Sequence, residues 1–349
     1  MSMLAPVFVA AIVAVSVPCI SSSEITAKSP AGHTISAVLE TGRPSIRRPA
    51  VILVSGSGPH TRDYSTASSD DKANHAFREL ARQLLLAGFA VVRFDERGTG
   101  LSTGDYARTA TTATLAEDVQ ALITVVVRRA EVDPNRIILV GHSEGSVIAT
   151  IVAGRERSVA AIALLSAPAW TGRRIMEWQD AYQLKYGEWS SFRPTQESRL
   201  EWLASERQRR ESADVWFPFF LDYDPLPAIR RVRVPILILH GDADVHVTPD
   251  QATEIAQAAT DAGNARVTLQ VLPGLSHSLG DPASSFPPPL SASVGAKLTD
   301  WLSATLGYRP RQRSCAAPRR AAGAATPPST TAPDRSASPI APVSSTQSA

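Results

Sequence analysis

Cysteine is nearly absent from this chain: only Cys19 and Cys315 occur among 349 residues. Two cysteines so far apart give no disulfide framework, and no group of cysteine, histidine and acidic residues has the spacing of a metal site. The sequence also lacks a P-loop and a dinucleotide-binding fingerprint. The glycine-rich stretch 98–104 has neither the lysine nor the spacing of a phosphate-binding loop. We therefore expect no metal and no cofactor.

An excess of one charge sign is missing as well. Lys and Arg number 35 against 33 Asp and Glu, a net charge of +2. We therefore expect neither nucleic acid nor an anionic membrane surface as the main partner. The expected partner is a small-molecule substrate. With 44% hydrophobic residues the chain can bury one large core. The oligomeric state stays open.

Long hydrophobic runs are limited to residues 4–20, 17 residues that are followed by three serines. A membrane-spanning helix needs about 20 apolar residues. We therefore expect 1–23 to be a signal peptide and the protein to be exported, without stable membrane insertion after cleavage; an uncleaved membrane anchor is the alternative. At the other end, 309–349 is rich in Pro, Ala, Ser and Arg and is expected to be disordered.

Between these ends, residues 24–308 alternate apolar strands with amphipathic helices. This alternation predicts an α/β fold with a mostly parallel sheet covered by helices on both faces. The expected strands are Glu24–Ala27, His33–Glu40, Ala50–Ser55, Ala90–Phe94, Arg136–Val140, Ala160–Leu165, Ile236–His240 and Val267–Leu272. The expected helices are Phe77–Ala87, Leu115–Ala130, Val147–Ala153, Ile175–Tyr186, Gln196–Glu211, Gln251–Ala262 and Val294–Leu306, with a loop over 95–112.

Residues 170–230 interrupt the alternation and hold five of the six tryptophans. We interpret them as a helical lid inserted after the sixth strand. Aromatic side chains in a lid either line an apolar pocket or hold the lid together. The aromatic run at 215–220 is the part expected to face substrate, through Trp216, Phe217, Phe219 and Phe220.

The most informative stretch is GHSEG at 141–145. It follows the apolar run Ile137–Val140 and precedes residues at helical spacing. A G-x-S-x-G pentapeptide between a strand and a helix is typical of a nucleophile elbow, in which a sharp turn exposes the serine hydroxyl. Side chains at Gly141 or Gly145 would collide with the neighbouring strand and helix. Ser143 is therefore the predicted nucleophile.

A serine nucleophile needs a histidine base and a carboxylate that orients it. The loop after Ile236–His240 offers Asp242 and Asp244, and the loop after Val267–Leu272 offers His277. Loops at the carboxyl ends of parallel strands meet at one edge of a sheet. His277 is preferred over the other six histidines, which lie in the elbow, in a strand or outside the expected loop: His33, His60, His75, His142, His240 and His246.

In its elbow and in these acid and histidine loops, the chain resembles the α/β-hydrolase superfamily, and the resemblance covers roughly 30–307. That resemblance implies Asp244 as the acid, because it stands three residues after the glycine of H-G-x-x-D, and it assigns a turn to Asp242. The oxyanion donors are expected to be the backbone N–H of Glu144 and, by resemblance, that of Ser57.

Three motifs narrow the resemblance to a group of bacterial esterases similar to serine aminopeptidase-like hydrolases. They are SGSGPHTRD at 55–63, RFDERGTGLSTGD at 93–105 and the GHSEG elbow. By that resemblance Arg62, Asp63 and 95–98 are scaffold residues. Ser146 departs from the group, which often has glycine there.

These residues predict a serine carboxylesterase-type hydrolase acting on short- to medium-chain acyl esters through an acyl-enzyme. The alternatives are an aminopeptidase, for which Glu177, Asp180 or Glu188 would hold the substrate amine, and an acyl transferase or thioesterase. A non-catalytic binding protein on the same scaffold is less favoured, because Ser143, Asp244 and His277 are all present.

Overall fold

A computed structural model describes residues 20–42, 46–64, 76–187, 195–284 and 289–308. All of them belong to one compact unit, Met1–Ser314, whereas a second unit, Cys315–Ala349, lies outside the described residues. Most of the predicted leader and all of the predicted tail also lie outside them. The leader boundary expected after Ser23 falls within a strand that begins at Ser21. Within the described ranges, no helix has the length and apolarity needed to cross a membrane.

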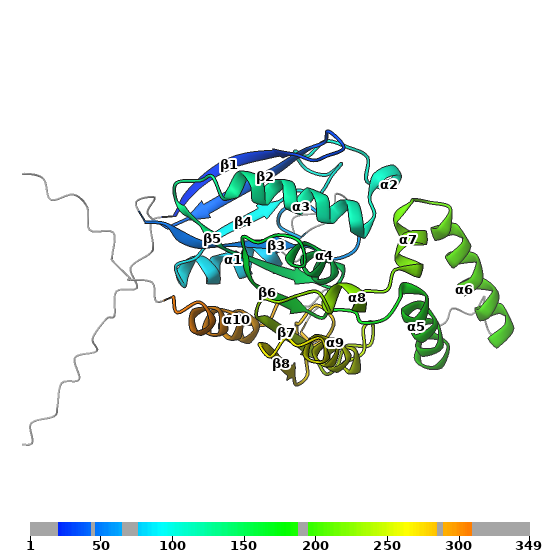
Figure 1. Cartoon of the computed structure of the whole chain (residues 1–349). Helices are drawn as coiled ribbons and strands as arrows, with labels where there is room; N and C mark the ends of the chain where they lie inside the picture. The colour runs from blue at the N-terminus through cyan, green and yellow to red at the C-terminus, as the bar shows by residue number, and fades with distance from the viewer. Residues whose placement is uncertain (1–19, 43–45, 65–75, 188–194, 285–288, 309–349) are drawn as a thin grey trace, which may run out of the picture. The chain divides into compact units, whose positions relative to one another are not determined.

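The core of the described structure is a single eight-stranded sheet in the order β1-β2-β4-β3-β5-β6-β7-β8 (Figure 1). β1 and β2 form an antiparallel hairpin, and β2 pairs antiparallel with β4; the remaining pairs are parallel. The strands are β1 Ser21–Lys28, β2 Thr34–Thr41, β3 Arg48–Val54, β4 Ala90–Phe94, β5 Val132–His142, β6 Val159–Leu165, β7 Ile236–Gly241 and β8 Val267–Leu272.

Helices cover both faces of this sheet because the central strands are apolar on both sides. In β5, Ile137 and Leu139 belong to one buried cluster, and Ile138 and Val140 belong to the other. The first cluster includes residues of α3, α4, α8 and α9, and the second those of α1 and α10. These helices are α1 Ala76–Leu86, α3 Thr112–Val126, α4 Glu144–Ala153, α8 Leu226–Ile229, α9 Asp250–Asp261 and α10 Ala292–Thr305. The predicted doubly covered, mostly parallel sheet is confirmed.

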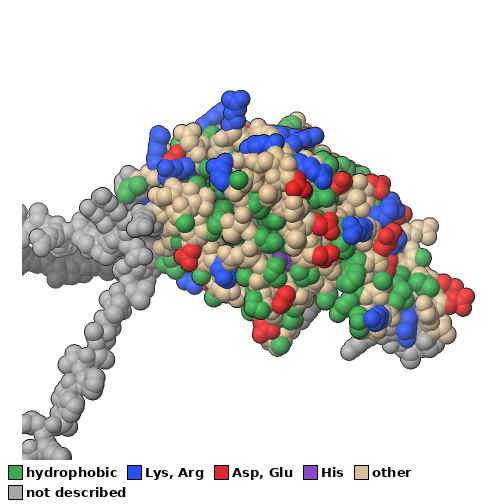
Figure 2. Space-filling view, turned by 60° about the horizontal axis from the view of Figure 1, so that its bottom comes forward, with side chains coloured by type: hydrophobic (Ala, Val, Ile, Leu, Met, Phe, Trp, Pro, Cys, Tyr) green, Lys and Arg blue, Asp and Glu red, His purple; other side chains and the backbone are tan. Residues whose placement is uncertain are grey.

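The segment interpreted as a lid lies between β6 and β7. It forms α5 Gly172–Tyr186, α6 Gln196–Glu211 and α7 Trp216–Asp222 before the chain enters α8. Figure 1 shows α5, α6 and α7 grouped beyond one end of the sheet. In Figure 2, hydrophobic side chains gather where this group meets the body of the molecule.

One expected loop contains a helix. The sequence predicts a loop over 95–112, but α2 forms at Tyr106–Thr109. The Asp105 side chain starts this helix by accepting a hydrogen bond from the backbone N–H of Arg108. A helix of four residues is too short for a helical periodicity to appear in the sequence.

Candidate active site

Ser143 occupies a strained turn between β5 and α4. Its φ of 52° and ψ of −120° are rare for a residue with a side chain. Two hydrogen bonds fix the turn: the Ser143 N–H donates to the Leu165 carbonyl (2.8 Å), and the Ser146 N–H donates to the Ser143 carbonyl (2.9 Å). The turn therefore presents the Ser143 hydroxyl beyond the end of the sheet.

The two glycines of the elbow allow this turn because backbone lies against each of them. A Cβ on Gly141 would lie 2.1 Å from the carbonyl oxygen of Gly145. A Cβ on Gly145 would lie 2.2 Å from the carbonyl oxygen of Val54, at the end of β3. Both contacts are far below the van der Waals distance, and both obstacles are backbone. The elbow packs in this way only with glycine at both positions.

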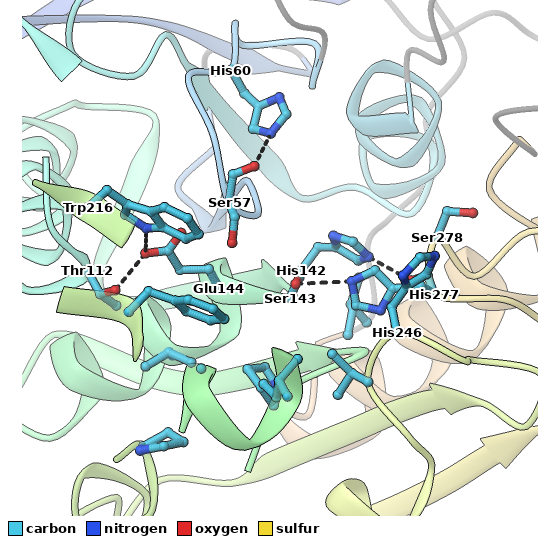
Figure 3. A pocket seen from close by; sticks show the side chains of 18 of the residues that line it. Ser57, His60, Thr112, His142, Ser143, Glu144, Trp216, His246, His277 and Ser278 are labelled. Atoms are coloured by element: carbon cyan, nitrogen blue, oxygen red, sulfur yellow. Dashed lines mark hydrogen bonds between the residues drawn. The ribbon is translucent and has the colours of Figure 1, made fainter. Parts of the chain in front are cut away.

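The structure brings Ser143, His277 and Asp244 together from three separate loops. His277 Nε2 lies 3.1 Å from Ser143 Oγ, and His277 Nδ1 lies 2.8 Å from Asp244 Oδ2. Figure 3 shows the imidazole of His277 pointing at the Ser143 hydroxyl. The loops follow β5, β7 and β8, at the carboxyl ends of parallel strands where such groups are expected to meet.

Asp244 is a buried carboxylate with an unusually complete set of donors. Oδ2 faces His277 and also His240 Nε2 at 3.2 Å, while Oδ1 accepts from the backbone N–H groups of His246 and Val247 (both 2.9 Å). Burial acts to raise the pKa of Asp244, but the hydrogen bonds from His240, His277 and Val247 outweigh it and hold that pKa well below its usual range. Asp244 is therefore an anion at neutral pH and favours the His277 tautomer with hydrogen on Nδ1.

His142, the variable residue of the elbow, holds the His277 loop. Its Nε2–H donates to the His277 carbonyl (2.8 Å), and its Nδ1 accepts from the Tyr64 hydroxyl (2.5 Å). Burial and the nearby His277 lower the pKa of His142 to about 3, so its ring is neutral. Sequence reasoning missed this role because the contacts join segments 78 and 135 residues apart.

Removing the Tyr64 hydroxyl tests this support. In Tyr64→Phe, the ring can still pack on Phe77, but Nδ1 of His142 loses its donor. We expect kcat for a hydrolysed ester to fall by about three- to tenfold, because His277 is held less firmly. Steady-state kinetics measure this, and a KM change without a kcat change would contradict it.

Two backbone N–H groups in segments beside Ser143, those of Glu144 and Ser57, make no hydrogen bond to another described residue. Glu144 is the first residue of α4, so its N–H lies at the positive end of a helix. Ser57 belongs to the loop after β3, which approaches Ser143 closely: a Cβ on Gly56 would lie 3.3 Å from Ser143 Cβ. The carbonyl of Ser57 is held by His60 Nε2 at 3.0 Å, as Figure 3 shows. This arrangement can receive a developing oxyanion.

A buried acid in the loop after β4, Glu96, anchors the loop that contains Ser57. Glu96 Oε1 accepts from the Ser55 hydroxyl, and Oε2 accepts from the backbone N–H of His60, both at 2.8 Å. Beside it, Asp95 receives the Arg62 guanidinium (2.8 Å). Farther along, the fully buried Arg97 pairs with Asp118 (2.8 Å). These contacts support the interpretation of Arg62 and 95–98 as scaffold.

Ser143 and His277 open onto an apolar pocket of about 610 Å³. Lid residues supply much of its wall, among them Trp170, Ile175, Met176, Trp216 and Phe220. His246, which lies beside His277 with ring centroids 5.7 Å apart, also lines it, although the sequence placed it off the site. A volume of this size suits a drug-sized or smaller organic ligand.

Only two of the four aromatic residues expected to face substrate line this pocket. Trp216 and Phe220 line the pocket, with their rings stacked 4.9 Å apart. The prediction was wrong for Phe217 and Phe219, which are not among the lining residues. Phe217 is 1% exposed within the core, and Phe219 stacks on Tyr223. Because α7 is a helix, successive aromatic residues point in different directions.

Comparison with protein families places part of this chain beside known hydrolases. A sequence model of the family described as Hydrolase_4, serine aminopeptidase S33, matches residues 72–215, which include the elbow. A comparison with proteins of curated function gives no significant match.

Solved structures give the same fold. An esterase from Pyrococcus furiosus is 18% identical, with a TM-score of 0.59, over 83% of this chain and 92% of its own. An α/β hydrolase from a Penicillium species is 17% identical, with a TM-score of 0.56, over 82% and 100%. Dipeptidyl peptidase 4 of Porphyromonas gingivalis is 16% identical, with a TM-score of 0.53, over 81% and 35%. This chain therefore has the α/β-hydrolase fold, and the family match supports a hydrolase of the serine type.

Proposed function

We propose that this protein is a serine hydrolase that cleaves carboxylic esters with short- to medium-chain acyl groups. The observation that carries the proposal is the continuous series of contacts from Ser143 Oγ through His277 to the buried Asp244. A serine hydroxyl is a poor nucleophile until a base takes its proton, and this geometry supplies the base and its orienting anion.

The reaction follows from these positions. Ser143 Oγ attacks the ester carbonyl carbon while His277 Nε2 takes the hydroxyl proton, and the N–H groups of Glu144 and Ser57 stabilise the oxyanion. The tetrahedral intermediate collapses to an acyl-Ser143, and His277 returns the proton to the departing alcohol. Water, deprotonated by His277, then attacks the acyl-enzyme, and the carboxylic acid leaves as Ser143 regains its proton.

An ester fits the pocket better than a peptide with a free amine. An aminopeptidase needs a carboxylate to hold the substrate ammonium, but Glu177 and Asp180 are absent from the lining residues. Asp180 is instead paired with Arg207. Glu188, the third candidate, lies outside the described residues.

The family description and the dipeptidyl peptidase likeness keep peptide cleavage as the second candidate. Thioester cleavage and acyl transfer would use the same acyl-Ser143 and differ in the leaving group or in the group that accepts the acyl chain. A non-catalytic binding protein would not need a histidine in contact with the Ser143 hydroxyl, which disfavours that alternative.

A fluorophosphonate probe and a substrate panel test the proposal together. We expect the probe to label the protein at Ser143 and to leave Ser143→Ala unlabelled. We expect p-nitrophenyl esters from acetate to octanoate to be hydrolysed faster than aminoacyl nitroanilides or acyl thioesters. Folded protein that resists the probe would argue for a binding protein, and preferred cleavage of the nitroanilides would argue for a peptidase.

A further inference from the structure

The side chain of Glu144 joins three parts of the site. It is 3% exposed, although it directly follows the nucleophile. Its Oε1 accepts two hydrogen bonds, from the Thr112 hydroxyl at the start of α3 (2.6 Å) and from Trp216 Nε1 in α7 of the lid (2.7 Å). Figure 3 shows both bonds converging on this oxygen. One carboxyl therefore connects the elbow, the body and the lid.

The second oxygen, Oε2, is buried and has no hydrogen-bond partner within the described residues. The Ser57 side chain also acts on this carboxyl, but no hydrogen bond between Ser57 and Oε2 is closed in the structure. Oε1 accepts two hydrogen bonds, so Oε2 is the oxygen of this carboxyl that makes none within the described residues. The same carboxyl therefore interacts with the side chain of the residue expected to supply the other oxyanion N–H.

An ionised carboxylate at Glu144 would need a nearby cation to balance its charge. The described groups that interact with Glu144 electrostatically are not cations. No described basic side chain acts on Glu144. Glu144 acts electrostatically on Glu96 from the loop after β4, on Tyr64 from the loop after β3 and on Tyr106 from α2. A buried carboxylate without a cation is strongly unfavourable, and Glu96, a second buried carboxyl within range, would add to that cost whenever it is ionised.

We infer that Glu144 is an uncharged carboxylic acid in the active protein. In this role it positions Trp216 and Ser57 around Ser143 and is not an anion for a substrate amine. The carbonyl oxygen Oε1 accepts from Thr112 and Trp216, and the proton is on Oε2, the oxygen without an acceptor role. The inference rests on the proposed esterase function and narrows its substrates to esters without a free amine at this position.

The chemistry of the oxyanion explains why the neutral form matters. A negative charge on Glu144 would lie on the residue whose own N–H is expected to stabilise the oxyanion, and like charges repel. Burial raises the pKa of Glu144, against the hydrogen bonds from Thr112 and Trp216 and the nearby Ser57 side chain, which lower it. Activity should therefore fall as the pH rises through this raised pKa.

Glu144→Gln tests the inference, because an amide keeps one acceptor and one donor and cannot ionise. We expect it to retain at least about a tenth of kcat/KM at pH 7, whereas Glu144→Ala should lose about a hundredfold. The alkaline fall in the kcat/KM profile should weaken or move to higher pH in Glu144→Gln. Glu201→Gln, on an exposed position of α6, should keep the parental profile.

Thermal unfolding tests the neutral state without any substrate. The unfolded chain loses the Glu144 proton near pH 4, but the folded chain keeps it to higher pH, so the parent loses stability as the pH rises between these two pKa values. Glu144→Gln has no such loss. Its Tm relative to the parent should rise by a few °C from pH 4 to pH 8, while that of Glu201→Gln stays constant.

Two results would overturn the inference: a Tm difference for Glu144→Gln that does not change with pH, or cleavage of aminoacyl nitroanilides by the parent that only Glu144→Gln abolishes. Failure of the proposed function looks different. In that case the parent hydrolyses no ester and resists the fluorophosphonate, while the pH dependence of the Tm difference still reports on Glu144.

Discussion

Asp244→Asn is expected to lower kcat for ester hydrolysis by about 10⁴-fold while the protein still folds. An asparagine that keeps its oxygen on the backbone N–H groups of His246 and Val247 turns its NH₂ toward His277 Nδ1. That nitrogen must then accept, so the proton moves to Nε2, where it faces the Ser143 hydroxyl. His277 can no longer take the serine proton, and single-turnover kinetics should show slow acylation.

Asp242→Asn is the matched control, because Asp242 was the other candidate acid. Its Oδ1 accepts from the backbone N–H of Gly274, and it makes no contact with His277 in the described structure. We expect kcat to stay within about threefold of the parent, as for a substitution remote from the reacting atoms. A reversed result, with Asp242→Asn inactive and Asp244→Asn active, would remove Asp244 from the mechanism.

The depressed pKa of Asp244 also gives a pH dependence of stability. A carboxylate whose folded pKa lies below its unfolded value stabilises the fold fully above the unfolded pKa, about 4. That stabilisation is lost as the pH falls through the folded pKa. The stability difference between the parent and Asp244→Asn should therefore be constant above about pH 5 and shrink below about pH 4, as denaturant unfolding at several pH values can measure.

Gly145→Ala is expected to destabilise the fold strongly, because the added methyl group meets backbone atoms of the central sheet. The new Cβ would lie 2.2 Å from the carbonyl oxygen of Val54 and 2.4 Å from that of Ser55. Both obstacles are backbone at the end of a central strand, so α4 must move away from β3. We expect a loss of more than about 3 kcal/mol in the free energy of unfolding, or insoluble protein.

Gly154→Ala at the other end of α4 is the control. There the nearest atom to a new Cβ lies 3.5 Å away, an ordinary contact, and φ is −72°. We expect the free energy of unfolding to change by less than about 1 kcal/mol. If urea unfolding gave the two variants equal stability, the close contact between Gly145 and the backbone of Val54 would be contradicted.

The order of strands and helices could be predicted because each element repeats its own period. Ile137–Val140 is apolar at every position, as a strand buried on both faces must be, and α1 shows a helical apolar stripe. The ends of elements were less predictable, and the one-turn helix α2 was missed, because hydrogen bonds at an end depend on the local fold. Chain order and strand ends together indicated Ser143, His277 and the pair Asp242 and Asp244, and the resemblance to α/β hydrolases then selected Asp244.

The contacts around these residues could not be predicted in the same way. Nothing in the sequence near His142 shows that its ring lies between Tyr64 and the His277 backbone. Nothing near Trp216 shows that its indole donates to Glu144, or that Phe217, one residue later, is buried in the core. These outcomes depend on how the lid and the loops dock on the sheet.

The sequence by itself determined the fold class and the elbow that holds Ser143, because hydrophobic periodicity and glycine placement are local properties of a chain. The choice of Asp244 over Asp242 came from the resemblance to α/β hydrolases. Only the tertiary structure decided which lid aromatics reach the pocket, what supports His277, and that Glu144 is buried near Glu96 with no basic side chain of the described residues acting on it. Burial and charge environment arise from segments that are distant along the chain, so no short stretch of sequence contains them.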